Sequence, residues 1–366
     1  MLYITNKGIK DFRKSIRNKY LFLIGAGVVS LNCIEMYSEY TTIMGIMDND
    51  SKKWNSTITF ENIMIPIVNP TELERMVKKV GKEHVVFVIS SYPYARELIE
   101  QLDDILEFDG IETYIQALMR NTKEETGIFE FSKGNIRIPK KIHYIWIGGK
   151  PIPKHLQYCI DSWKKYNPEY EIICWNENNY DFTKTAYMRE AYEKEAWGFA
   201  PDYARLDIIH EHGGIYLDTD VEVLRPLDCL LKDRAFMGMG SVDRMNLGIG
   251  FGAEKHCEII KDFRDYYENF HFVNSDGSLN RKPCCHYQHP VLKKYGFSIE
   301  NEYQKIDDIV LYPAEVLSPK GTSGMGDFFS DNTLAIHHGE GSWYTDKEKE
   351  GVSLLKKYIE SRISFL

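Results

Sequence analysis

Residues 215–220 read Ile-Tyr-Leu-Asp-Thr-Asp, and this stretch decides the fold of the chain. Three apolar residues suited to a strand run directly into Asp218 and Asp220, which are one residue apart. Because a strand projects residues i and i+2 to the same side, the two carboxylates can close on one cation at the end of the strand. Paired acids of this kind suit Mg²⁺ or Mn²⁺ where the metal also holds the phosphates of a substrate.

A helix with a glycine stop is predicted just before this strand. Pro201 suits a first helical turn, and Gly213 and Gly214 end the helix because glycine accepts the left-handed conformation. Asp202 and Arg205 are three residues apart and therefore share one face of that helix. Taken alone, the two indicate a surface ion pair. Ahead of an acid pair, they suit a polar clamp on a sugar, with Arg205 as donor and Asp202 as acceptor.

A second strand with a glycine turn is predicted further upstream. Residues 142–149 read Ile-His-Tyr-Ile-Trp-Ile-Gly-Gly, a β-rich run that ends in a glycine pair. Glycines at this point let the backbone turn sharply or approach a ligand closely. Trp146 is therefore a candidate to stack on a nucleotide base. The alternative is a tryptophan buried in the core.

These segments, together with residues 337–343 (His-His-Gly-Glu-Gly-Ser-Trp), resemble glycosyltransferase family 32. The family comprises DXD-containing sugar-transferase domains, and the same elements are similar to the catalytic domain of the large glucosylating bacterial toxins. The resemblance covers roughly residues 136–345. It implies a GT-A fold, a nucleotide-sugar donor, a divalent metal and retention of configuration at the anomeric carbon.

The resemblance also implies roles for individual residues. Asp202 and Arg205 would hold the donor sugar, and both would count with the acid pair as catalytic residues. The metal ligands that it implies are Asp218, Asp220 and His337, with His338 as the second choice for the imidazole. Asp218 can reach ribose or sugar as well as metal. The remaining donor-binding residues that it implies are Trp146, Ile147, Ser342 and Trp343.

The C-terminal histidines have a physical argument of their own. Residues 334–336, Leu-Ala-Ile, suit a short strand that delivers His337 and His338. Because adjacent residues on a strand point to opposite faces, only one histidine should face the site. Imidazole suits Mn²⁺ better than Mg²⁺, so the expected cofactor is Mn²⁺, with Mg²⁺ as the alternative.

The first third of the chain has a separate organisation. Strand patterns at 20–24, 42–47, 63–68 and 85–89 alternate with helical patterns, which predicts a small Rossmann-like parallel α/β domain. We expect this domain at residues 1–125 and a GT-A glycosyltransferase domain at residues 126–366. The loop Gly25-Ala26-Gly27 with Asp48 resembles a dinucleotide fingerprint, but Ser30 stands where a third glycine belongs. A structural or sugar-nucleotide-sensing role is therefore favoured over a bound dinucleotide.

Composition excludes some classes of protein. The net charge of −9 argues against a nucleic-acid partner held on a basic face. No signal peptide and no apolar run of spanning length are apparent, and seven irregularly spaced cysteines fit a reducing, cytoplasmic compartment. Basic residues near the N-terminus flank Ile9, Phe12 and Ile16. That face either packs on its own domain, which is favoured, or makes a peripheral contact with the inner face of the membrane.

The sequence therefore predicts a metal-dependent retaining glycosyltransferase. It would move a hexose from a nucleotide diphosphate sugar, with UDP favoured by the toxin resemblance, to a saccharide or lipid-linked acceptor in surface or capsular polysaccharide synthesis. One alternative is a non-catalytic nucleotide-sugar binding protein. Another is a phosphatase resembling the haloacid dehalogenases, although these want Thr or Val where the chain has Glu222, four positions after Asp218.

Overall fold

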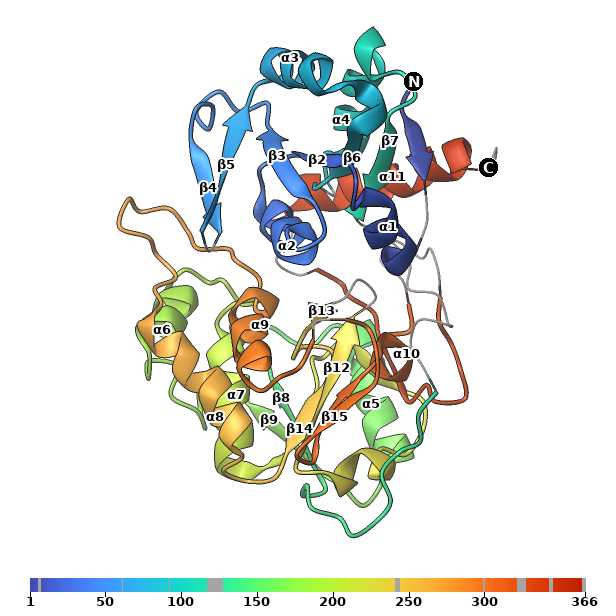
Figure 1. Ribbon diagram of the computed structural model, residues 1–366. Helices are drawn as coiled ribbons and strands as arrows, with labels where there is room; N and C mark the ends of the chain where they lie inside the picture. The colour runs from blue at the N-terminus through green and yellow to red at the C-terminus, as the bar shows by residue number, and fades with distance from the viewer. Residues whose placement is uncertain are drawn as a thin grey trace. The chain divides into compact units, whose positions relative to one another are not determined.

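The computed structural model describes residues 1–5, 8–60, 62–91, 93–116, 128–240, 244–298, 300–320, 327–341 and 345–363. The chain divides into two compact units. The first comprises Met1–Asn121 and Tyr344–Leu366, and the second comprises Thr122–Trp343 (Figure 1). Each unit contains a sheet flanked by helices, which confirms the predicted α/β class. No helix among the described residues has the length and apolarity needed to cross a bilayer.

The first unit is a parallel α/β sheet domain. Its strands are β1 (Tyr3–Thr5), β2 (Tyr20–Ile24), β3 (Thr42–Met47), β4 (Thr57–Phe60), β5 (Ile63–Val68), β6 (Val85–Ile89) and β7 (Glu112–Ile115). Its helices are α1 (Ile9–Ile16), α2 (Val28–Tyr37), α3 (Pro70–Val80), α4 (Ala95–Asp103) and α11 (Asp346–Ile363). Strands β2, β3, β5 and β6 have the boundaries predicted from their apolar runs. The short strands β1, β4 and β7 carry too weak a pattern to be predicted.

The strand order of this unit is Rossmann-like. The sheet runs β1-β7-β6-β2-β3-β5-β4, and only the β4–β5 pair is antiparallel. Counting from β2, the order β5-β3-β2-β6-β7 is the 3-2-1-4-5 arrangement of doubly wound folds. The glycine loop after β2 therefore stands at the point where the strand order reverses, which is where such sheets bind ligands.

Asp48, the acidic residue of the dinucleotide-like pattern, already has partners in the structure. Asp48 Oδ2 accepts the N–H of Ala26 at 2.7 Å and lies 3.1 Å from Lys53 Nζ. Ser30 is fully buried in the first turn of α2, and its hydroxyl donates to the Gly27 carbonyl at 2.6 Å. The carboxylate that a dinucleotide ribose would require thus already accepts a hydrogen bond from its own glycine loop, and the role of this domain stays a prediction.

Both terminal helices of the first unit pack on that unit. In α1, Ile9, Phe12 and Ile16 have no exposed surface, so the apolar face of this helix is occupied by its own domain. In α11, Leu355 is fully buried, and the ring of Tyr358 lies 5.9 Å from the guanidinium of Arg96 in α4. The structure thus differs from the predicted division, which placed the C-terminal residues with the transferase domain, because α11 packs on α4.

The second unit is a mixed α/β sheet domain. Its strands are β8 (Lys141–Ile145), β9 (Glu171–Trp175), β10 (Gly214–Tyr216), β11 (Val221–Val223), β12 (Ala235–Gly240), β13 (Arg244–Met245), β14 (Phe251–Ala253), β15 (Gln304–Ile306), β16 (Ile309–Tyr312) and β17 (Ala335–His337). Its helices are α5 (Lys154–Tyr166), α6 (Ala186–Glu193), α7 (Pro201–His212), α8 (Glu258–Tyr266), α9 (Cys285–Lys294) and α10 (Ala314–Leu317). The main sheet runs β15-β16-β12-β14-β10-β8-β9, and β11 pairs with β17 in a separate ribbon.

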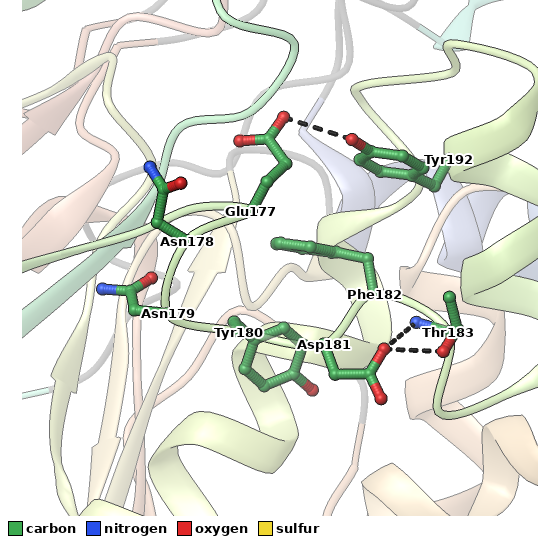
Figure 2. Close-up of a pocket in the computed structure, with 8 residues that line it drawn as sticks. All are labelled: Glu177, Asn178, Asn179, Tyr180, Asp181, Phe182, Thr183 and Tyr192. Carbon is green, nitrogen blue, oxygen red and sulfur yellow. Dashed lines mark hydrogen bonds between the residues drawn. The ribbon is translucent and has the colours of Figure 1, made fainter.

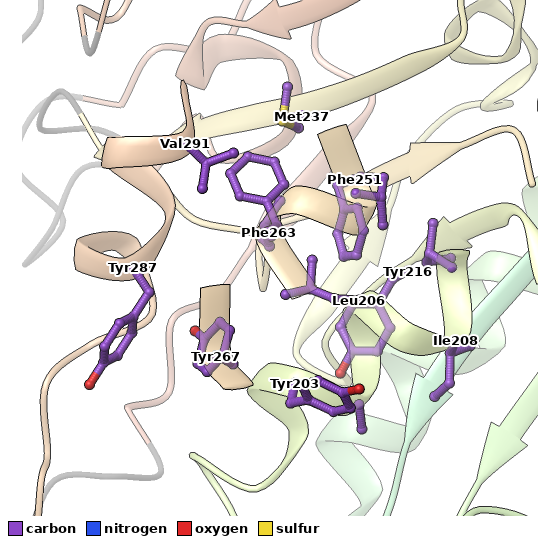
Figure 3. Close-up of a cluster of buried hydrophobic side chains, with 14 of the residues drawn as sticks. Tyr203, Leu206, Ile208, Tyr216, Met237, Phe251, Phe263, Tyr267, Tyr287 and Val291 are labelled. Carbon is purple, nitrogen blue, oxygen red and sulfur yellow. The ribbon is translucent and has the colours of Figure 1, made fainter. Parts of the chain in front are cut away.

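Two apolar clusters cover the two faces of this sheet. One joins Leu206 and Ile208 of α7 to Tyr216, Phe251 and other buried side chains, some of which Figure 3 shows. The other contains Ile160 and Trp163 of α5 together with side chains from the opposite face of the same strands. Helices α5 and α7 therefore lie on opposite faces, and the core between them fixes the strands that carry the candidate site.

Candidate active site

The order of strands β10, β8 and β9 places a topological switch point, where a ligand crevice is expected, at one edge of the sheet. All three are parallel, with β8 in the middle. The chain passes from β8 through α5 to β9 on one face, and returns through α7 to β10 on the other. The reversal therefore lies between β8 and β10, and ligands of open α/β sheets bind outside the carboxyl ends of strands at such a point. Trp146 directly follows β8, and Asp218 comes two residues after β10.

The helix, glycine stop and strand before the acid pair are as predicted. Helix α7 ends at His212, and Gly213 follows it with φ +63°. Gly214, with φ +107°, begins β10, where a side chain would lie 2.9 Å from the Lys141 carbonyl oxygen. Glycine is thus required both by the backbone angle and by the close approach of β8. This turn aims the acid pair at the crevice.

Asp218, Asp220 and His337 converge in the structure. The N–H of Val221 donates to the Asp218 carbonyl at 3.1 Å, and Val221 pairs with His337 across the β11–β17 ribbon. This register brings one ligand atom from each of the three side chains to within 4.8 Å of the others. Side-chain exposures of 32%, 15% and 17%, in chain order, leave the group accessible to an incoming ion.

The electrostatics of this group suit a cation. Burial alone would raise the pKa of Asp220, but the neighbouring His337, at 3.5 Å, outweighs it and holds that pKa below its usual range. Burial raises the pKa of Asp218, and Arg205 only partly offsets the effect. Two carboxylates and an imidazole form a ligand set that divalent first-row metals accept, and a metal would replace the proton on His337.

His338 faces away from the acid pair. Its Nε2 lies 3.0 Å from Glu222 Oε2, while its backbone N–H donates to the Asp220 carbonyl at 3.0 Å. The alternation of a strand explains the difference between neighbouring histidines. Between the two candidates left open by the sequence, the structure brings His337 to the acids.

Asp202 and Arg205 lie next to this group as a buried ion pair. Arg205 Nη2 is 3.1 Å from Asp202 Oδ1 and 3.8 Å from Asp218 Oδ1. Its guanidinium also lies over the ring of Tyr216, whose hydroxyl donates to Asp218 at 3.1 Å. Burial raises the pKa of Asp202 to about 7, against the opposing effect of Arg205. Arg205 therefore links buried Asp202 to Asp218, an arrangement that the interpretation as a surface ion pair missed.

Trp146 and Ile147 occupy different environments. The indole of Trp146 is partly exposed at the crevice edge, and its N–H donates to the Lys150 carbonyl at 2.6 Å. Ile147 is 8% exposed and belongs to the core, so a donor would meet only its backbone. The glycine turn has φ +85° at Gly148 and +68° at Gly149. Ser342 and Trp343 lie outside the described residues.

A pocket of about 570 Å³ lies beside this glycine turn (Figure 2). Its lining residues are Glu177, Asn178, Asn179, Tyr180, Asp181, Phe182, Thr183 and Tyr192. Glu177 Oε1 accepts the N–H of Gly148 at 2.7 Å, and the rings of Phe182 and Tyr192 stack at 5.6 Å. This pocket was not predicted from the sequence. The signal for it was the polar run Asn-Glu-Asn-Asn between a strand and an aromatic pair.

A second group of metal-type side chains has a different explanation. His210, Glu211 and His256 also bring ligand atoms within 4.8 Å of one another. Arg264, however, lies 3.1 Å from His210 Nδ1 and 3.7 Å from Glu211 Oε1. The guanidinium already supplies the positive charge at this place, so the group is best understood as part of an ion-pair network.

Comparisons with known proteins agree with the geometry of the second unit. Residues 153–237 match the family described as "Glycosyltransferase sugar-binding region containing DXD motif". The chain is 28% identical over 152 residues to inositol phosphoceramide mannosyltransferase 3 of Schizosaccharomyces pombe, covering 39% of this chain and 42% of that protein. It is 28% identical over 146 residues to the mannosyl phosphorylinositol ceramide synthase SUR1 of Saccharomyces cerevisiae, covering 37% of each.

The chain thus spans less than half the length of these curated relatives. Among solved structures, the PaToxG glycosyltransferase is similar with 21% identity and a TM-score of 0.35, over 43% of this chain and 68% of that one. The sheet order and the family match together confirm the predicted fold, a GT-A type domain after a small Rossmann-like domain. The second unit of this chain therefore contains a segment, residues 153–237, that matches the DXD-containing glycosyltransferase sugar-binding region.

Proposed function

We propose that this chain transfers a hexose from a nucleotide diphosphate sugar to a saccharide or lipid-linked acceptor in a metal-dependent reaction. The observation that carries the proposal is the convergence of Asp218, Asp220 and His337 at the crevice between β8 and β10. Partly exposed ligands at a nucleotide-binding edge fit a metal that also holds a diphosphate. The mixed carboxylate and imidazole set favours Mn²⁺ over Mg²⁺.

In glycosyl transfer, the C1–O bond to the diphosphate breaks and its electron pair stays on the phosphate oxygen. A new C1–O bond forms to the acceptor hydroxyl, whose proton passes to the departing phosphate or to solvent. A bound divalent ion supplies charge neutralisation at the leaving group. Asp218, Asp220 and His337 would hold that ion, while Arg205 fixes the Asp218 carboxylate. Asp202, which is buried against Arg205, keeps that guanidinium in place beside Asp218.

The donor is proposed from two likenesses. The curated relatives are named as mannosyltransferases, which favours mannose as the transferred sugar. The likeness to glucosylating toxins favours a UDP-sugar. Trp146, at the mouth of the crevice, would stack on the base of either nucleotide. Retention of configuration, a role in surface or capsular polysaccharide synthesis, and a cytoplasmic site with peripheral membrane contact stay predictions.

Donor hydrolysis without acceptor tests the proposal directly. The purified chain is incubated with UDP-glucose, UDP-galactose, UDP-N-acetylglucosamine, GDP-mannose or GDP-fucose, with Mn²⁺ or with EDTA. We expect slow, Mn²⁺-dependent release of nucleoside diphosphate from one of these donors. Absence of both turnover and a metal-dependent thermal shift with all five would remove the proposal.

The two alternative functions predict different results. A phosphatase of the haloacid dehalogenase type would release phosphate from p-nitrophenyl phosphate. That class needs Thr or Val where this chain has Glu222, whose carboxylate instead bonds to His338 at 3.0 Å and to Tyr158 at 3.1 Å. A non-catalytic binding protein would show a thermal shift with one donor and metal but no hydrolysis. Donor hydrolysis, p-nitrophenyl phosphate hydrolysis and the thermal shift together therefore separate the three functions.

A further inference from the structure

A short turn packs against Asp218, the first acid of the pair. Residues 246–250 read Asn-Leu-Gly-Ile-Gly and join β13 to β14. The side-chain oxygen of Asn246 accepts the N–H of Gly248 at 2.8 Å, and its backbone carbonyl accepts the N–H of Ile249 at 3.0 Å. An Asn side chain bonded to a backbone N–H two residues later fixes the path of a turn. The carboxamide of Asn246 thus determines where Gly248 lies.

Gly248 is in direct contact with the metal-facing acid. Its carbonyl accepts the N–H of Asp218 at 3.2 Å. A Cβ atom at position 248 would overlap Asp218 Oδ2 and would lie 3.1 Å from both Arg205 Nη1 and Asn246 Oδ1. The backbone of the turn is therefore the surface against which the Asp218 carboxylate rests. Any shift of the turn moves that carboxylate or leaves a gap behind it.

The same carboxamide also ties the turn to helix α9. Cys284 precedes α9, and its Sγ lies 3.4 Å from Asn246 Oδ1. Asn246 N–H is 3.4 Å from the Gly238 carbonyl of β12. The turn is thus connected to a helix and to a central strand as well as to Asp218. These contacts give the turn a fixed position from which it can hold the acid.

We infer that Asn246 is a positioning residue of the metal site. Its Oδ1 atom holds Gly248, and Gly248 in turn holds the main chain and carboxylate of Asp218 in the orientation that a divalent cation requires. Groups that orient metal ligands in this way typically change metal affinity by about 10- to 100-fold when they are removed. This inference rests on the proposed function and adds to it a residue that binds neither metal nor sugar.

Direct measurement of Mn²⁺ binding tests the inference without sugar turnover. Isothermal titration calorimetry is performed on the full chain, on Asn246→Ala and on Asn246→Asp, which keeps an acceptor oxygen at the same place. Asp276→Ala is the matched control, because Asp276 Oδ1 accepts the N–H of Ser278 at 2.9 Å in the same kind of bond on an exposed turn. Thermal unfolding without metal is recorded for all four proteins.

We expect Asn246→Ala to weaken Mn²⁺ binding by at least about tenfold. Asn246→Asp should bind within about threefold of the unchanged chain, and Asp276→Ala should bind as the unchanged chain does. With an active donor, Asn246→Ala should regain part of its lost rate at high Mn²⁺, as expected for weakened metal binding.

Mn²⁺ affinity of Asn246→Ala within twofold of the unchanged chain would overturn the inference and leave the proposed function standing. The same holds if Asp276→Ala weakens binding as much as Asn246→Ala. If the unchanged chain shows no saturable Mn²⁺ binding, the proposed function fails and the inference fails with it.

Discussion

Arg205 Nη2 lies 3.1 Å from Asp202 Oδ1, and the two side chains are only 5% and 2% exposed. In an ion pair this deeply buried, each charge compensates the desolvation cost of the other, because either charge alone would be destabilising in the core. The same guanidinium lies 3.8 Å from Asp218, at the accessible edge of the site. Arg205 therefore connects the interior of α7 to the metal-facing acid.

Removing the Arg205 side chain should lower the stability of the second unit. In Arg205→Ala, Asp202 keeps only the Tyr187 hydroxyl at 3.5 Å and loses its cationic partner, and we expect a loss of about 3–5 kcal/mol in the free energy of unfolding. Urea denaturation followed by circular dichroism measures it, with Arg189→Ala on helix α6 as the control. A loss below about 1 kcal/mol would contradict the interpretation of a buried, coupled pair.

Substitutions of the adjacent histidines His337 and His338 should have different effects on metal binding. His337→Ala removes the imidazole near Asp220 and should weaken Mn²⁺ binding by about 10- to 100-fold. His338→Ala removes only the contact with Glu222 and should leave the affinity within about threefold. Electron paramagnetic resonance of free Mn²⁺ measures both variants. Equal losses in the two would show that the register of β17 does not select one ligand.

Asp220→Asn should abolish turnover and preserve the fold. The amide keeps the shape of the side chain and an oxygen that can accept the Glu340 N–H, now at 3.0 Å, but it loses the charge. We expect donor hydrolysis to fall by about a thousandfold or more. Glu222→Gln, two residues further along the chain, is the matched control. Full activity of Asp220→Asn would remove this residue from the metal site.

Gly248→Ala should damage the site by steric overlap alone. The added methyl group meets Asp218 Oδ2 and lies 3.1 Å from Arg205 Nη1, so the carboxylate must move. We expect at least a tenfold loss of Mn²⁺ affinity with native circular dichroism. Gly27→Ala is the control, since nothing lies within 4 Å of its added atom. Unchanged metal binding in Gly248→Ala would mean that the turn does not support Asp218.

His143 should make the catalytic unit acid-sensitive. Burial lowers the pKa of this imidazole from 6.5 to about 4, while its Nδ1 accepts the Trp175 indole N–H at 3.0 Å. In the unfolded chain this histidine takes up a proton near pH 6.5, whereas in the folded chain it stays neutral until about pH 4. The stabilising contribution of neutral His143 is therefore fully present above pH 6.5 and is lost as the pH falls toward 4. The loss is about 3 kcal/mol at most.

Unfolding free energies at pH 7.5 and pH 5 measure this effect. His143→Gln removes the titrating group, so the pH-dependent loss should be smaller in this variant than in the unchanged chain. Titration of the His143 ring by NMR gives the pKa directly. A value near 6.5, or an equal pH dependence in the two proteins, would contradict the expectation.

The parts of the site that could be predicted are those encoded by neighbours in the sequence. The stop at Gly213 and the acids at 218 and 220 follow from local patterns, and the structure places them accordingly. The role of Asn246 depends on a hydrogen bond that brings Gly248 against Asp218, thirty residues away. A turn sequence alone does not say which strand it meets. The burial of Asp202 and Arg205 was missed for the same reason.

The C-terminal helix has a consequence for the whole molecule. Helix α11 belongs to the first unit, so the chain leaves that unit, forms the transferase and then comes back. The second unit is thus an insertion, and both of its ends connect to the first unit, its host. While the host stays folded, an unfolded insert is a closed loop with less conformational freedom than an open chain, and this restriction favours refolding. A single proteolytic cut between the two units would remove this restriction on the unfolded chain. The second unit would then unfold at a lower temperature.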